Sequence, residues 1–220
     1  MRTSYAIRAL SGLTVIGLIG APAVVAQASP AHTHMGHVAE SFRGTPEGLG
    51  GLLPTAVAEA EIAAQHAELA GRDPSNLDGM RRHMGHVINA LDPSLVDAGP
   101  GLGYGVKAAA TGTARHIGLA GGSDGASDNV KTHATHVETA ATNAANWADE
   151  AVALARRIQE ATDAAAAARL LEELVSKTSA IVSGMDANGD GRIGWQEGEG
   201  GLAQATQHMT LMMRGEGMSG

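Results

Sequence analysis

The feature that most constrains the fold is a long apolar stripe in the second half of the chain. Its members fall alternately three and four residues apart, as one face of an α-helix requires: Val137, Ala140, Ala144, Trp147, Ala151, Leu154 and Ile158. A sustained alternation of branched or aromatic residues with polar ones, which would indicate strands, occurs nowhere in the chain. The sequence therefore predicts an all-α protein.

Helical patterns between Pro- and Gly-rich segments predict helices at about 55–71, 74–91, 106–119, 131–161 and 164–183, and the stripe lies on the fourth of them. A helix running unbroken from residue 131 to residue 183 would be about 80 Å long, too long for a domain of this size. A break is expected near Thr162 and Asp163, both good helix caps. The expected architecture is an up-and-down bundle of four to five helices.

The sequence divides the chain into four segments. Residues 1–28 resemble a secretory signal peptide, because Arg2 and Arg8 precede an apolar run and the triplet Ala26-Gln27-Ala28 follows it. Residues 29–54 hold three Pro and five Gly and are expected to form a flexible, His-containing arm. Residues 55–160 are predicted to form the bundle, and residues 163–213 a further helical segment packed on it. We expect a periplasmic or secreted protein.

Composition excludes several classes of partner and site. Removal of Arg2 and Arg8 would leave 13 basic against 23 acidic residues, a formal charge of −10, which disfavours nucleic acid and anionic membranes. Only four aromatic residues would remain, too few for a base-stacking platform. The chain has no Cys, so disulfides and thiolate metal sites are excluded. Any metal must be bound by oxygen, imidazole or thioether.

The most specific motif is the stretch DANGDGRIGWQE at residues 186–197. Its first, third and fifth residues are Asp186, Asn188 and Asp190, its sixth is Gly191, and its twelfth is Glu197. Calcium takes six to eight oxygen ligands, and this spacing supplies them from one loop that turns sharply at the glycine. Arg192 would contribute its backbone oxygen, Glu197 would bind bidentately, and Gly194 would leave a position to water.

This loop resembles that of the EF-hand family, and Val182 and Met185 match apolar positions of that family's entering helix. The resemblance covers about residues 170–212. It implies a Ca²⁺ site in a helix-loop-helix unit, and a homodimer through pairing of two such units. The residues GEGG at 198–201 depart from the family pattern, because glycine is a poor start for an exiting helix.

Three pairs of histidines share the spacing H-x-x-H, and two of them lie in the repeated tetrapeptide HMGH. The pairs are His34 with His37, His83 with His86, and His133 with His136. Residues three apart are neighbours on one face of a helix, so each helical pair can present two imidazoles together. We expect the second and third pairs to converge into one cluster, joined by His116 and His66, and the first pair to act together with His32 as a tethered chelator.

Imidazole suits zinc, copper, nickel and iron, and the adjacent Met thioethers favour copper, so a copper or zinc site is one interpretation. A second is that the histidines are structural, in a calcium-stabilised module that binds a protein partner. A third is a b-type haem held by two histidines, since Gly85 inside a helix indicates that something approaches its backbone closely, either a neighbouring helix or a haem. No nucleophile elbow, phosphate loop or H-E-x-x-H helix is found, so we expect a binding protein rather than an enzyme.

Overall fold

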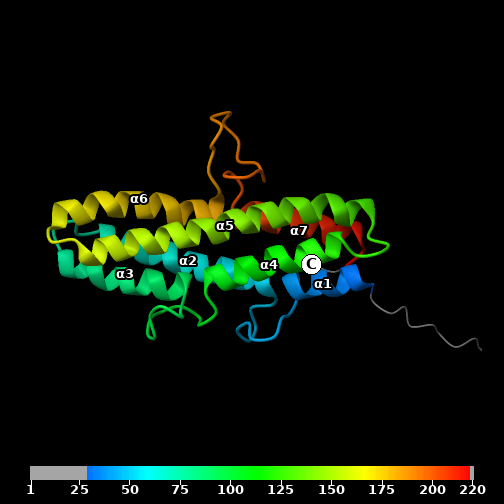
Figure 1. Ribbon diagram of the computed structural model, residues 1–220, viewed down its shortest axis with the longest axis horizontal. Coiled ribbons are helices and arrows are strands. Elements are labelled where there is room, and N and C mark those ends of the chain that lie inside the picture. The colour runs from blue at the N-terminus through cyan, green and yellow to red at the C-terminus, as the bar shows by residue number, and fades with distance from the viewer. Residues whose placement is uncertain (1–28, 219–220) are drawn as a thin grey trace, which may run out of the picture.

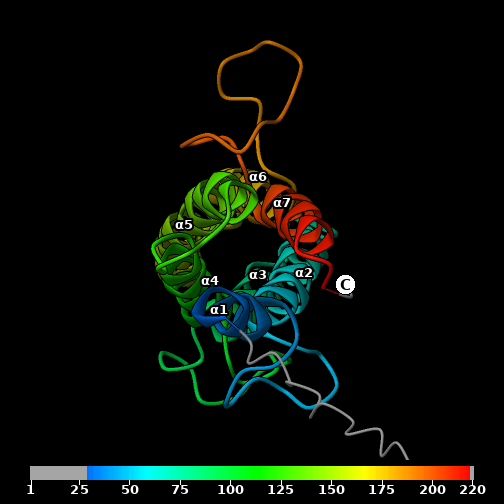
Figure 2. The same cartoon turned by 90° about the vertical axis from the view of Figure 1, so that its right-hand side faces the viewer.

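Four antiparallel columns of helix form the part of the chain that the computed structural model describes, residues 29–218 (Figure 1). The first column is α1 (Pro30–Ala39) followed by α2 (Leu52–Gly71), and the second is α3 (Leu77–Leu91) followed by α4 (Val106–Gly121). The third is α5 (Asp128–Glu160) alone, and the fourth is α6 (Ala164–Ser183) followed by α7 (Leu202–Gly215). Figure 2 shows these columns packed around one axis. The all-α prediction is confirmed.

Each column packs against its two neighbours. The second contacts the first through α2 with α3 and α1 with α4, and α5 contacts α3 and α4 on one side and α6 and α7 on the other. Contacts of α2 with α6 and α7 close the bundle. Three columns are interrupted by the loops 40–51, 92–105 and 184–201, which project from the bundle (Figure 1). The described residues therefore contain seven helices rather than four or five.

Side-chain caps begin both α5 and α6. The Asp163 side chain caps α6 by accepting a hydrogen bond from the Ala166 amide at 2.8 Å, which confirms the break predicted there. Ser127 caps α5 in the same way, accepting from the Val130 amide at 3.1 Å. The cap at Ser127 marks the start of α5 and the cap at Asp163 marks the start of α6, so the chain reverses direction before each of these helices.

The core is built largely of alanine. Every member of the predicted stripe on α5 is buried, from Val137 at one end to Ile158 at the other. Small side chains allow the helices to approach closely: a Cβ added at Gly121 of α4 would lie 2.9 Å from the Cβ of Ala134 on α5. Close packing of this kind fixes the relative rotation of neighbouring helices, and hence which side chains meet at their edges.

The segment predicted to be a flexible arm contains α1, so that prediction is wrong for residues 30–39. Ser29 caps this helix by accepting from the His32 amide at 3.1 Å, and Pro30 occupies its first turn, where proline is favourable. Met35 and Val38, three apart, are fully buried. The capping signal was present in the sequence, but the glycine content of the following loop concealed it.

The predicted signal peptide, residues 1–28, lies outside the described residues. Among the helices that are described, none combines the length and the apolar character that crossing a bilayer requires.

Candidate metal centres

Three triads of histidine lie at the edges between neighbouring columns. Triad A is His34, His37 and His116; triad B is His66, His83 and His86; triad C is His133, His136 and His208. In each triad the three ligand nitrogens lie within 4.8 Å of one another. The chain has ten histidines, so the triads account for all but one of them.

The three triads have the same construction. Each joins an H-x-x-H pair from the first half of one column to a single histidine from the second half of the neighbouring column. The pairs lie on α1, α3 and α5, and their single partners lie on α4, α2 and α7 respectively. A spacing of three places both imidazoles of a pair on one helix face. The antiparallel neighbour supplies the third imidazole at the same level.

The nitrogens are close enough to share one ion. In triad A the Nδ1 atom of His116 lies 3.0 Å from that of His34 and 3.3 Å from that of His37. The corresponding Nδ1 distances are 3.0 and 3.2 Å in both triad B and triad C. Nitrogens bound tetrahedrally at about 2.0–2.1 Å from a metal are about 3.3 Å apart. In each triad the two distances from the single histidine are therefore within a few tenths of an ångström of that value, and all three ligand nitrogens lie within 4.8 Å of one another.

None of the family models, curated proteins or solved structures compared with this chain matches it. The chemistry of the triads is therefore argued from their own geometry and surroundings.

The surroundings favour the neutral form of several triad histidines. Burial, followed by the positive charge that neighbouring members of the triad would carry, lowers the pKa of His66, His116 and His136. The same causes lower the pKa of His208 to about 4. Neutral imidazole is the form that binds a metal, so these residues need not lose a proton to do so at neutral pH.

The histidines predicted as ligands all belong to triads, but they are grouped differently from the expectation. His83 and His86 lie in triad B while His133 and His136 lie in triad C, so the two pairs do not converge into one cluster. The reason is topological, since α3 and α5 each pair their histidines with a different neighbouring helix. His34 and His37 are on α1 with His116 rather than on a tethered arm.

The three single histidines were not assigned correctly from the sequence. His208 was not predicted as a ligand, and His66 and His116 were expected to join the single large cluster, whereas His116 lies with His34 and His37. A lone histidine carries no spacing signal of its own. Its role depends on which helix lies beside it, and that is decided by the long-range order of the columns.

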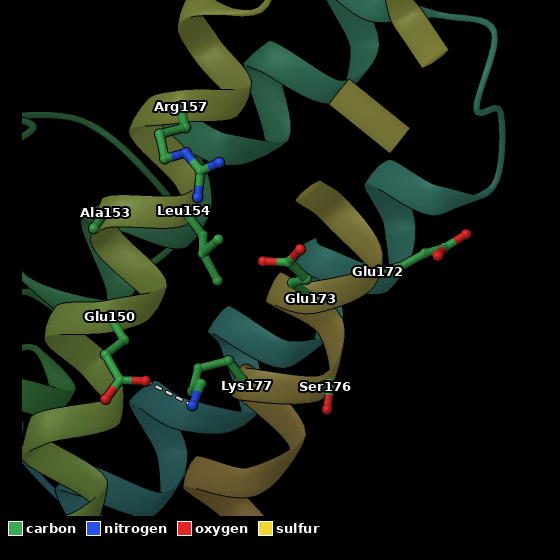
Figure 3. A pocket seen from close by; sticks show the side chains of 8 residues that line it. All are labelled: Glu150, Ala153, Leu154, Arg157, Glu172, Glu173, Ser176 and Lys177. Carbon is green, nitrogen blue, oxygen red and sulfur yellow. Dashed lines mark ion pairs between the residues drawn. The ribbon is translucent and has the colours of Figure 1, made fainter. Parts of the chain in front are cut away.

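A fourth edge of the same construction would join the second half of α5 to α6, and no triad is found there among the described residues. A cavity of about 680 Å³ lies between these two helices, lined on α6 by residues between 172 and 177 (Figure 3). Leu154 and Glu173 project toward this cavity, and Lys177 bridges it to Glu150 with an Nζ to Oε2 distance of 2.6 Å. This edge between α5 and α6 therefore carries an ion pair and an apolar side chain where the other edges carry imidazoles.

The loop that resembles an EF-hand projects from the bundle between α6 and α7 (Figure 1). Asp186 accepts hydrogen bonds from the amides of Gly189, Asp190 and Gly191 at 2.8–3.1 Å. Gly191 has φ +82°, the conformation expected of the turning glycine at that position. Within the described residues, the groups of three close acidic or histidine side chains are the His triads, so the loop carboxylates are not gathered around one point. After this loop the next helix, α7, begins only at Leu202.

The backbone of Gly85 is not closely approached. A Cβ added there would have Gln159 Nε2 as its nearest neighbour at 3.9 Å, an ordinary van der Waals distance. The expectation of a close approach at this glycine is therefore wrong.

Met35 and Met84, which lie inside the two HMGH motifs, are fully buried in the hydrophobic core, whereas the histidines on either side of them are half-buried at its edge.

Proposed function

We propose that the protein binds transition-metal ions at triads A, B and C, about one ion in each. The observation that carries the proposal is the repeated geometry: three separate pairs of helices each bring the Nδ1 of a single histidine within 3.0–3.3 Å of both Nδ1 atoms of an H-x-x-H pair. Structural histidines scattered over a helical protein would not be expected to assemble nine of ten into equivalent triads. Selection for a common ligand accounts for the repetition.

The contacts within a triad also favour an ion over a network of hydrogen bonds. A neutral imidazole either donates from Nδ1 or accepts there, so three converging Nδ1 atoms cannot all be satisfied by one another. A cation at the centre would be bound by all three lone pairs. Haem fits less well, because two axial nitrogens on opposite faces of one iron are about 4 Å apart with the macrocycle between them.

The donor set indicates the class of metal. Three imidazoles without thiolate suit zinc, copper, nickel or iron, and among divalent ions copper binds such sites most tightly. Three ligands leave a fourth position for water. Because three copies of one site increase the number of ions held per chain, we infer a role in binding or sequestering copper or zinc rather than in catalysis.

Stoichiometry tests this proposal. The metal-free, untagged protein is expected to bind about three Zn²⁺ ions, and each of the variants His66→Gln, His116→Gln and His208→Gln about two, because each removes one ligand from a different triad. His32→Gln is the matched control, since His32 pairs with Glu216 instead of joining a triad, and it should still bind about three. Equilibrium dialysis followed by elemental analysis measures the ratio. Unchanged stoichiometry in all three ligand variants would refute the proposal.

A second candidate function is calcium binding by the loop 184–201, through the ligands that the EF-hand resemblance implies. The match of the twelve-residue pattern supports it. One further observation favours a cation in this loop. Glu199 is 4% exposed, its Oε2 accepts from the Gly194 amide at 3.0 Å, and its Oε1 is buried without a hydrogen-bond partner. A protein with calcium here and metal-free histidines would be the calcium-stabilised interaction module.

Calorimetric titration with Ca²⁺ tests the second candidate. Asp186→Ala and Glu197→Gln each remove a ligand that the motif assigns, and each is expected to weaken Ca²⁺ binding at least tenfold. Asp163→Asn is a suitable control, because Asp163 is an exposed acidic residue that caps α6 away from the loop. Equal Ca²⁺ affinity in the variants and the parent protein would dismiss the loop as the site.

We further infer that the protein is exported and that its mature chain begins near Ser29. This is supported by the leader-like pattern of residues 1–28. Ser29 is also the N-cap of α1, so cleavage after Ala28 would leave α1 and triad A complete. The first residue of the protein isolated from its native cells is expected to be Ser29, as N-terminal sequencing would measure. An intact mass including residues 1–28 would contradict export by cleavage.

A further inference from the structure

The aromatic residues distinguish the triads from one another. Trp195, in the loop 184–201, stacks on His136 of triad C with a centroid distance of 4.0 Å and an interplanar angle of 20°. Phe42, after α1, meets His37 and His116 of triad A only edge-on, at 5.5 and 4.9 Å. At triad B the described residues show no aromatic ring contact other than those among its own histidines. Triad C is therefore the one whose ligand is held face to face by another ring.

The loop that carries Trp195 is anchored to the helix that carries His136. Asn143, 4% exposed on α5, donates from Nδ2 to the carbonyls of Gln196 and Gly200 at 2.8 and 2.9 Å. Its Oδ1 accepts from the amide of Gly198 at 3.0 Å. Asn143 follows His136 by two helical turns and so lies on the same side of α5. The position of Trp195 over His136 is thus fixed by α5 itself.

We propose that triad C binds its ion most tightly and fills first, and that Trp195 is the positioning residue responsible. This inference rests on the proposed function of the triads. The stack restricts rotation of the His136 ring, so its Nδ1 remains directed at His208 before an ion arrives, and less ordering is needed on binding. Contacts that orient a metal ligand in this way typically change affinity 10- to 100-fold when removed.

Two double variants isolate single triads for measurement. His66→Gln/His116→Gln leaves triad C complete, and His116→Gln/His208→Gln leaves triad B complete. Adding Trp195→Leu is expected to weaken Zn²⁺ binding by about tenfold or more in the first background and to leave it unchanged in the second. Trp195→Phe, which retains a stacking ring, should restore most of the affinity. Equal loss in both backgrounds would mean that Trp195 acts only on folding, and no loss in either would overturn the proposal.

Fluorescence provides a second measurement in the otherwise complete protein. The chain has two tryptophans, so Trp147→Phe leaves Trp195 as the only one. Zn²⁺ added to the metal-free variant is expected to change the Trp195 emission almost entirely within the first of about three equivalents. A change that begins only with the second or third equivalent would overturn the filling order while leaving metal binding itself intact. Failure to bind any Zn²⁺ would instead refute the proposed function.

Discussion

Saturation with Zn²⁺ is expected to raise the free energy of unfolding by about 12 kcal/mol when the free ion is at a thousand times each dissociation constant. Each ion that binds only the folded chain contributes about 4 kcal/mol under that condition. The triads exist only in the folded bundle, because every one joins two helices that are distant in sequence or separated by a turn. Guanidinium unfolding of the protein with Zn²⁺ and with a chelator measures the difference.

The triple variant His66→Gln/His116→Gln/His208→Gln is the control, because it breaks all three triads and leaves each pair in place. Its unfolding midpoint should respond little to Zn²⁺. If the midpoint rises as much in the triple variant as in the parent protein, the ions bind elsewhere and the stabilisation does not come from the triads.

Acid should remove this stabilisation and also weaken the metal-free protein. The folded-state pKa of His208 is about 4, below its ordinary value of 6.5. Above pH 6.5 both folded and unfolded chains hold this residue neutral, so it has no effect. As pH falls from 6.5 toward 4 the unfolded chain takes up the proton and the folded chain does not, so unfolding becomes easier. Metal binding weakens over the same range because protons compete for the ligands.

The general architecture was predictable because its signals are local. The stripe from Val137 to Ile158 and the cap at Asp163 each depend on residues within a few turns of one another, and the structure confirms both. The H-x-x-H spacing is also local, so all three pairs were found. Helix α1 was missed because its short apolar face is followed directly by a glycine-rich loop.

The grouping of the histidines could not be predicted because it depends on column order. His116 was assigned to the wrong pairs, and His208 to none, since each single histidine meets its partners only after the bundle closes. The Trp195 contact with His136 is likewise non-local, joining a projecting loop to a helix 59 residues earlier in the chain. Local spacing identifies candidate ligands, whereas topology determines which of them share an ion.

Replacement of Glu59 is the second change expected to have a large effect. Glu59 on α2 is fully buried, and its carboxylate accepts hydrogen bonds from the amides of Leu102, Tyr104 and Gly105 at 2.8–3.0 Å. Gly105 is the N-cap residue of α4, so Glu59 holds the end of the loop 92–105 and the start of α4 in place from the neighbouring column. Glu59→Ala leaves three amides without a partner and should cost about 3–5 kcal/mol of unfolding free energy.

The matched control for this change is Glu61→Ala, an exposed glutamate on the same helix, which should alter the unfolding free energy by no more than about 0.5 kcal/mol. Chemical denaturation measures both. Because α4 carries His116, Glu59→Ala should also weaken Zn²⁺ binding at triad A more than at triad C, whose helices α5 and α7 make no hydrogen bond to Glu59. Equal stability of the Glu59 and Glu61 variants would show that the loop 92–105 can satisfy its own amides. The carboxylate would then have no part in placing His116.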